Sequence, residues 1–145
     1  YTVLIDYSHT PDSLENILRA VRGFCTGRII AVFGCGGDRD PFKRPVMGKI
    51  AAELSDLAIV TSDNPRTEDP YKILRQILAG MQDTETPYEV IESRVSAIGR
   101  AMELAQKDDV IVLCGKGHET YQEIGHEKHH LDEREVVASY LEANA

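Results

Sequence analysis

The sequence predicts an α/β domain with three αβα layers, built around a mostly parallel, Rossmann-like sheet of about six strands. Short, uniformly apolar runs alternate with helical patterns along the whole chain. Strands of this kind are typical of a parallel sheet that is covered by helices on both faces. The length of 145 residues suits a single domain, and a domain of this size buries roughly two thirds of the surface of its unfolded chain.

Five main strands are predicted in runs that are rich in β-branched and other apolar residues. They cover residues 2–5, 28–33, 57–61, 88–91 and 110–114. Two further short segments, at 121–124 and 128–130, are predicted to form a hairpin about Gly125. Because helical patterns separate the main runs, we expect these runs to pair in parallel.

Helices are predicted where apolar residues recur at helical spacing. The first begins at Pro11, with Thr10 as its N-cap, since proline is favoured at the first helical position and threonine just before it. The others are predicted over 44–54, from about 70 through 78, over 94–105 and over 132–141.

The bulk composition excludes some partners. The net charge of −8 argues against nucleic acid, whose phosphates need a basic face. No signal peptide and no apolar run of membrane length is visible in these residues, so no membrane partner is expected. Three scattered cysteines fit a reducing, cytoplasmic compartment, and Cys35 and Cys114 are predicted to be buried core thiols. The abrupt start on a strand predicts a piece of a longer protein, cut at a domain boundary.

Polar and glycine-rich segments follow four of the predicted strands. They are residues 6–10, 34–40, 63–66 and 115–119. Ligands of parallel α/β sheets bind at the carboxyl ends of the strands. Because the unusual residues gather at those ends, the sequence favours a binding site over a set of unrelated turns.

The segment Asp63–Arg66 reads Asp-Asn-Pro-Arg and follows the third strand. Pro65 restricts the backbone, so the loop presents a carboxylate, an amide and a guanidinium in a defined arrangement. Asp63 suits a ligand's ammonium group, and Arg66 suits a carboxylate held by two hydrogen bonds. The alternative from these residues alone is a structured turn that caps the next helix.

Two glycine-rich turns are further candidates. In residues 34–40, Arg39 stands where a dinucleotide fingerprint needs its third glycine, but it adds an anion-binding group to an exposed backbone. In residues 115–119, which are not a P-loop, Lys116 suits a phosphate and Glu119 an ammonium. The alternatives are a tight charged turn and a loop whose glycines only permit a bend.

The remaining polar residues give weaker indications. Asp6 suits a ribose and His9 an adenine or a phosphate, the alternative being helix capping with a surface histidine. No Cys partner or helical spacing supports a metal site at the hairpin histidines, which are expected on the surface. No nucleophile lies beside an activating base in the sequence, so no catalytic residue is predicted in this domain alone.

Together with Lys43–Pro45, these segments resemble the C-terminal domain of the Mur ligases, and in particular of the members that add meso-diaminopimelate. The matching segments, in the order of the family, are 6–14, 33–40, 43–45, 62–66 and 115–119. They span nearly the whole chain. Ser8 stands where relatives often have alanine, a difference that we expect to be harmless.

The resemblance implies a bacterial, ATP- and Mg²⁺-dependent ligase of peptidoglycan synthesis. In such a ligase ATP phosphorylates the terminal carboxylate of UDP-MurNAc-L-Ala-D-Glu, and the amine of meso-diaminopimelate attacks the acyl phosphate to form an amide. An N-terminal domain binds the uridine nucleotide, and a central domain holds most of the ATP and Mg²⁺ contacts. Residues 1–145 lack a P-loop, so this chain is expected to be the third domain, with the central domain as its partner and with no activity of its own.

The resemblance also implies roles for single residues. The amino-acid site would be lined by Arg39, Asp63, Asn64, Arg66, Gly115 and Glu119, and ATP would be touched by Asp6 and His9. Both arginines would hold carboxylates, while Glu119 and the Gly115 carbonyl would take the distal ammonium. Lysine-adding members usually lack the arginine of the Asp-Asn-Pro-Arg motif. The alternatives are a ligase for another amino acid such as lysine, a stand-alone nucleotide-binding or redox α/β domain, and an interaction module.

Overall fold

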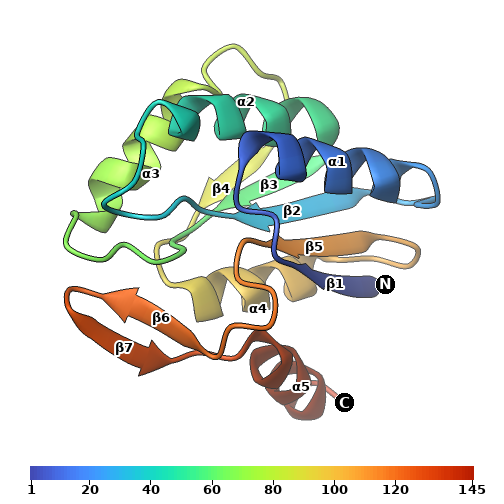
Figure 1. Ribbon diagram of the computed structural model, residues 1–145. Coiled ribbons are helices and arrows are strands. Elements are labelled where there is room, and N and C mark those ends of the chain that lie inside the picture. The colour runs from blue at the N-terminus through green and yellow to red at the C-terminus, as the bar shows by residue number, and fades with distance from the viewer.

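In the computed structural model, which describes residues 1–145, five parallel strands form a central sheet with helices on both faces (Figure 1). The order across the sheet is β1-β5-β2-β3-β4. The strands are β1 (Thr2–Asp6), β2 (Ile29–Phe33), β3 (Leu57–Val60), β4 (Tyr88–Val90) and β5 (Val110–Cys114). The predicted fold class is confirmed. The sheet has five strands rather than about six, because β6 (Tyr121–Ile124) and β7 (Glu127–His130) form a separate two-stranded sheet.

The helices divide between the two faces of the sheet. On one face lie α1 (Pro11–Arg22), α2 (Lys43–Leu54) and α3 (Pro70–Ala79), and on the other α4 (Arg94–Leu104) and α5 (Glu133–Ala143) (Figure 1). Alternate side chains of each strand enter opposite cores. Ile29, Ala31 and Phe33 pack under α1–α3, whereas Ile30 and Val32 pack against the layer of α4. Both faces are therefore apolar, which explains why the strand runs do not alternate with polar residues.

The helix boundaries follow from local sequence. Thr10 is the N-cap of α1, and its hydroxyl accepts a hydrogen bond from the Ser13 N–H in a reciprocal capping box. Asp69 and Ser93 cap α3 and α4 in a similar way. The predicted strands and helices agree with the structure to within two residues at each end.

The parallel register brings four loops to one edge of the sheet. Asp6 at the end of β1 lies opposite Cys114 at the end of β5, and Phe33 of β2 lies opposite Val60 of β3. The loops that follow these strands therefore emerge side by side, and the β6–β7 hairpin lies beside them (Figure 1). None of the helices is both long enough and apolar enough to traverse a lipid bilayer.

The predicted core thiols are buried. Cys114 is fully enclosed and Cys35 nearly so, and burial raises the pKa of each thiol to about 12. Both thiols are therefore protonated and inert at neutral pH.

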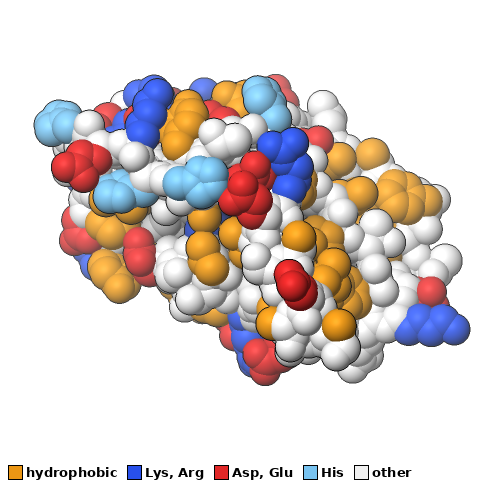
Figure 2. Space-filling model, turned by 90° about the horizontal axis from the view of Figure 1, so that it is seen from below, with side chains coloured by type: hydrophobic (Ala, Val, Ile, Leu, Met, Phe, Trp, Pro, Cys, Tyr) orange, Lys and Arg blue, Asp and Glu red, His pale blue; other side chains and the backbone are white.

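The hairpin histidines lie on the surface, as predicted. Figure 2 shows histidine and charged side chains gathered at the end of the molecule where the hairpin lies. His130 pairs with Glu135 at 2.7 Å, and His129 lies 3.6 Å from Glu127. No three His, Cys, Asp or Glu side chains converge as metal ligands would.

Candidate functional site

A cavity of about 410 Å³ opens at the carboxyl edge of the sheet, among the loops that follow β1, β2, β3 and β5. Of the eight residues that the family resemblance assigned to the amino-acid and ATP sites, seven line it: His9, Arg39, Asp63, Asn64, Arg66, Gly115 and Glu119. Asp6 does not line it. Its carboxylate accepts hydrogen bonds from the Ser8 N–H, at 3.0 Å, and from the Ser8 hydroxyl.

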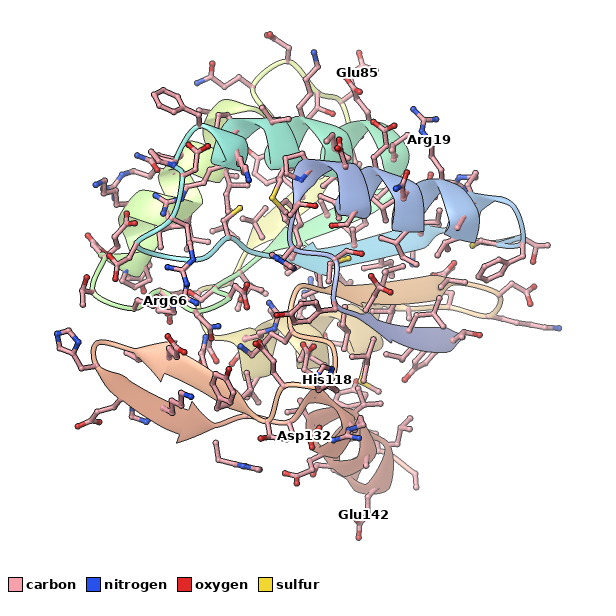
Figure 3. The ribbon with its side chains drawn as sticks, in the orientation of Figure 1. Arg19, Arg66, Glu85, His118, Asp132 and Glu142 are labelled. Atoms are coloured by element: carbon pink, nitrogen blue, oxygen red, sulfur yellow. The ribbon has the colours of Figure 1, made fainter.

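The Asp63–Arg66 loop is buried except at Arg66, which is half-buried. Arg66 has a φ of 51°, which is uncommon for a residue with a side chain. The hairpin holds this backbone in place, because the Arg66 N–H donates to the Glu123 carbonyl at 3.0 Å and the Gly125 N–H donates to the Arg66 carbonyl at 2.6 Å. In Figure 3 the Arg66 side chain lies between the ends of the strands and the hairpin.

The glycine-rich turn after β2 packs against this loop. The Gly37 N–H donates to the Asn64 carbonyl at 2.7 Å, and a Cβ at Gly37 would lie only 1.8 Å from the Pro65 carbonyl oxygen. The missing side chain at Gly37 thus lets this turn pack against the backbone of the Asp63–Arg66 loop, and not against a ligand. Gly36 does line the cavity, beside Nη1 of Arg66.

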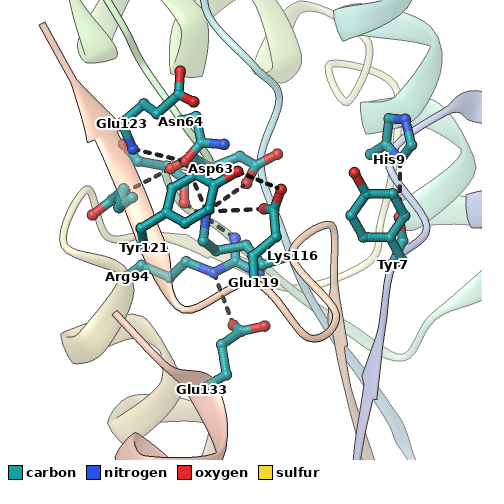
Figure 4. A network of polar contacts seen from close by, with 12 residues as sticks. Tyr7, His9, Asp63, Asn64, Arg94, Lys116, Glu119, Tyr121, Glu123 and Glu133 are labelled. Carbon is teal, nitrogen blue, oxygen red and sulfur yellow. Dashed lines mark hydrogen bonds and ion pairs between the residues drawn. The ribbon is translucent and has the colours of Figure 1, made fainter. Parts of the chain in front are cut away.

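The buried side chain of Lys116 links the Asp63–Arg66 loop to the loop of residues 115–119. It is fully buried, and its Nζ lies 2.7 Å from Oδ1 of Asn64 and 3.5 Å from both Oδ1 of Asp63 and Oε1 of Glu119 (Figure 4). The prediction that Lys116 faces a phosphate is wrong. A buried ammonium needs anionic or polar partners, and the neighbouring loop supplies them on the side away from solvent.

One end of the cavity is consequently acidic. The carboxylates of Asp63 and Glu119 stay partly exposed to it, and the single charge of Lys116 does not balance both. A ligand ammonium would meet a net negative charge there.

The neighbouring part of the cavity carries cationic side chains. Nε of Arg66 donates to Oε2 of Glu123 at 2.9 Å, and Nη1 donates to the Gly37 carbonyl at 3.0 Å. A guanidinium has five N–H donors, so three remain for a ligand. Arg39 is exposed, and its only hydrogen bond is to the carbonyl of Asp38. This arrangement can hold a small molecule that carries both ammonium and carboxylate groups.

An aromatic pair stands across the cavity from the Lys116 cluster (Figure 4). The rings of Tyr7 and His9 meet edge to face, with centroids 4.8 Å apart. Nδ1 of His9 lies 2.9 Å from the Tyr7 carbonyl, which makes Nδ1 the protonated nitrogen of a neutral ring. Both residues are exposed and so are available to stack on a planar ligand ring.

Two buried arginines were missed by the sequence-based predictions. Arg44 lines the cavity and is only 1% exposed; it donates to Glu68, to Gln76 and to the Gly36 carbonyl at 2.7–3.0 Å. Arg94, at the start of α4, forms a fully buried ion pair with Glu133 of α5 (Figure 4). In the sequence both arginines stand in the first turn of a helix, a place where a surface charge is equally common, and Arg44 also lies in the family-matching segment 43–45.

The Arg44–Glu68 pair predicts a pH dependence of stability. Hydrogen bonds from Arg44 lower the pKa of Glu68 from 4.5 to about 2 in the folded protein, against the opposing effect of burial. A depressed folded pKa gives stability that is present above the unfolded pKa and is lost as the pH falls through the folded one. The difference in unfolding free energy between wild type and Glu68→Gln should therefore shrink by about 2 kcal/mol on acidification from neutral pH to pH 2.

Urea unfolding at a series of pH values measures this difference. Glu53→Gln is the matched control, since Glu53 is exposed and lies 3.9 Å from Lys49. Its difference from wild type should stay small at every pH. A Glu68→Gln difference that is equally flat would contradict the prediction.

Known proteins resemble this chain over most of its length. The family model described as "Mur ligase, glutamate ligase domain" matches residues 1–117. Two curated relatives bear the name UDP-N-acetylmuramoyl-L-alanyl-D-glutamate--2,6-diaminopimelate ligase. That of Trichormus variabilis is 64% identical over 97% of this chain, and that of Clostridium tetani is 55% identical over 98% of it.

A solved structure of a ligase with the same name superposes with a TM-score of 0.94, at 42% identity over 98% of this chain. This chain spans only 28–29% of the length of these relatives and of that structure. The likeness therefore covers one part of a larger ligase.

Proposed function

Because this chain belongs to the family of Mur ligase glutamate ligase domains, we propose that it is the amino-acid-binding domain of a MurE-type ligase. That ligase adds meso-diaminopimelate to UDP-MurNAc-L-Ala-D-Glu in the synthesis of bacterial peptidoglycan. The amine of diaminopimelate attacks an acyl phosphate, so that an amide bond forms and inorganic phosphate leaves. The domain contributes by positioning the amine and its charged groups, and not by covalent chemistry.

The observation that carries the proposal is the placement of Arg66 beside the acidic end of the cavity. Diaminopimelate has a second amino-acid centre, with an ammonium and a carboxylate, where lysine has an ammonium alone. Asp63 and Glu119 suit the ammonium, and the open N–H groups of Arg66 suit the carboxylate. With lysine bound, Arg66 would be left without an anionic partner from the ligand, which penalises lysine.

Arg39, Asn64 and the Gly115 carbonyl complete the proposed amino-acid site. Arg39 would hold the other carboxylate. Oδ1 of Asn64 accepts hydrogen bonds from Nζ of Lys116 and from the Glu123 N–H, and so holds the lysine and the hairpin in place. Domain closure would bring the central domain of the ligase over the cavity.

ATP is the proposed co-substrate, and His9 with Tyr7 is the part of this chain best suited to contact it. Asp6 is a weaker candidate, because its carboxylate is engaged by Ser8. The donor set here does not fit Mg²⁺ by itself, so the ion would be held with ATP by the rest of the ligase. A cytoplasmic location follows from these substrates.

Calorimetric titration of the full-length ligase tests the proposal. We expect meso-diaminopimelate to bind more tightly than lysine when the nucleotide-dipeptide and a non-hydrolysable ATP analogue are present. Arg66→Ala should weaken diaminopimelate binding by about 10- to 100-fold, since hydrogen bonds between charged groups contribute about 1.5–3 kcal/mol. Lysine binding should not weaken, because lysine offers Arg66 no carboxylate at that end, and binding of the ATP analogue should change little. Equal affinity for the two amino acids in the wild type would overturn the proposed substrate while leaving the family intact.

A further inference from the structure

The β6 strand and the turn of the β6–β7 hairpin are hydrogen-bonded to the Asp63–Arg66 loop. Four hydrogen bonds with donor–acceptor distances of 2.6–3.0 Å join the two segments. They run from Gln122 Nε2 to the Asp63 carbonyl, from the Glu123 N–H to Asn64 Oδ1, from the Arg66 N–H to the Glu123 carbonyl and from the Gly125 N–H to the Arg66 carbonyl. Every residue of the loop except Pro65 thus contacts the hairpin.

The Glu123 side chain adds a fifth contact, to the guanidinium itself. Its Oε2 takes the Nε–H of Arg66 at 2.9 Å, while the Gly37 carbonyl takes one hydrogen of Nη1. The donors left without a protein acceptor are both hydrogens of Nη2 and one of Nη1. A ligand carboxylate can therefore approach Arg66 at the Nη1–Nη2 end of the guanidinium.

Packing alone does not fix this orientation. A second cavity of about 280 Å³ lies on the hairpin side of Arg66, so this side chain lines both cavities. The second cavity is also lined by three acidic side chains and by one further cation, Lys128, so its charges attract a guanidinium on balance; the acids are Asp38, Glu123 and Glu127. Without the bond to Glu123, Arg66 has both room and electrostatic reason to turn away from the main cavity.

The hairpin also lies outside residues 1–117, the segment that the general family model matches. The diaminopimelate ligases match 97–98% of the chain and therefore include it. The hairpin is therefore part of what this chain shares with the diaminopimelate ligases.

We infer that Glu123 is a positioning residue that turns the Nη1–Nη2 end of Arg66 toward the cavity and thereby sets the preference for an amino acid with a second carboxylate. This inference rests on the function proposed above. Glu123 touches neither the ligand nor the reacting atoms. It acts through Arg66, and its main-chain hydrogen bonds keep the hairpin docked whatever side chain stands at position 123.

Steady-state kinetics of the full-length ligase with meso-diaminopimelate and with lysine test the inference. Glu123→Ala should raise KM for diaminopimelate roughly tenfold, because the loss of a charge-assisted hydrogen bond is of that size. KM for lysine and kcat should change little, so the preference for diaminopimelate falls by the same factor. Glu123→Gln keeps an acceptor oxygen for Nε and should recover part of the loss.

Glu127→Gln is the matched control, since it removes a charge from the same hairpin at an exposed residue whose only ionic contact is His129. It should leave both KM values unchanged. An unchanged or lowered KM for diaminopimelate in Glu123→Ala would overturn the inference, the latter because it would show that Glu123 competes with the ligand for Arg66. A parallel rise in both KM values would overturn it too, since it would indicate a general structural role.

Arg66→Ala in the same assay distinguishes the positioning role of Glu123 from the proposed binding of the second carboxylate by Arg66. If Arg66→Ala lowers the preference and Glu123→Ala does not, only the positioning role fails. If Arg66→Ala also leaves the preference unchanged, the proposal that Arg66 binds the second carboxylate of diaminopimelate is wrong as well.

Discussion

Replacing Arg94 by methionine should lower the free energy of unfolding of this domain by about 3–5 kcal/mol, the usual effect of breaking a buried ion pair. Arg94 and Glu133 are both fully buried, and Nε lies 2.9 Å from Oε2. Burial disfavours the charged form of Arg94, but Glu133 and Asp63 outweigh it and raise its pKa. The substitution would therefore leave a carboxylate enclosed without its cation.

Arg94 also bridges the strand ends that carry the site. Its Nη1 donates to the Ser62 carbonyl at 3.1 Å and its Nη2 to the Cys114 carbonyl at 2.9 Å. These residues directly precede Asp63 and Gly115. Loss of Arg94 should thus loosen both loops in addition to the contact between α4 and α5.

Urea unfolding of the domain measures the effect, with Arg100→Met as the matched control. Arg100 lies on the same helix but pairs with Glu89 and Glu103 at the surface, so its loss should cost about 0–1 kcal/mol. The double variant Arg94→Met/Glu133→Leu should regain part of the stability, because no unpaired charge remains. Similar losses of unfolding free energy for Arg94→Met and Arg100→Met would contradict the prediction that the buried Arg94–Glu133 pair stabilises the domain more than a surface pair.

Lys116→Met should destabilise the domain by about 2–4 kcal/mol and disorder the acidic end of the cavity. Methionine fills a similar volume, but it leaves Asp63 and Glu119 facing each other without the cation that lies 3.5 Å from both. Asn64 Oδ1 would lose the shorter of its two hydrogen bonds and keep only the Glu123 N–H. We expect the loss to be smaller than for Arg94, since the two carboxylates are partly exposed.

Lys128→Met provides the control for Lys116. Both ammonium groups lie over the ring of Tyr121, at 5.7 Å for Lys116 and 4.4 Å for Lys128, but Lys128 is exposed on the hairpin. Thermal unfolding should show a large decrease in Tm for Lys116→Met and a small one for Lys128→Met. Equal decreases would mean that the buried hydrogen bonds of Lys116 contribute nothing beyond an exposed cation–π contact.

The parts of the structure that the sequence predicted well are those set by local pattern and by sheet geometry. The capping of α1 by Thr10 depends on neighbouring residues alone. The gathering of Arg39, Asp63 and Glu119 around one cavity follows from parallel pairing, which brings the carboxyl ends of strands to one edge.

The parts that escaped prediction depend on pairs of residues that are distant in the sequence. Glu133 stands at the start of the last helix, where an acid also complements the helix dipole, yet its partner Arg94 lies 39 residues earlier. Lys116 was assigned by residue type to a phosphate, whereas its direction is set by Asn64, 52 residues earlier. A charged side chain in a loop or at a helix start is compatible with solvent, ligand or a buried partner, and only the tertiary fold decides among them.

The order of strands in the sheet has a consequence for how this domain folds. β1 is an edge strand that pairs only with β5, and Thr2 lies opposite Val110. Strand pairs that are so far apart in the sequence form slowly, because the entropy cost of closing the long loop comes before any stabilising contact between the strands. At about 5–20 residues per second, a ribosome needs on the order of ten seconds to make the chain between them. The first strand of the domain to be synthesised is therefore among the last to be paired, and the cavity between the loops after β1 and β5 can form only when that pairing is complete.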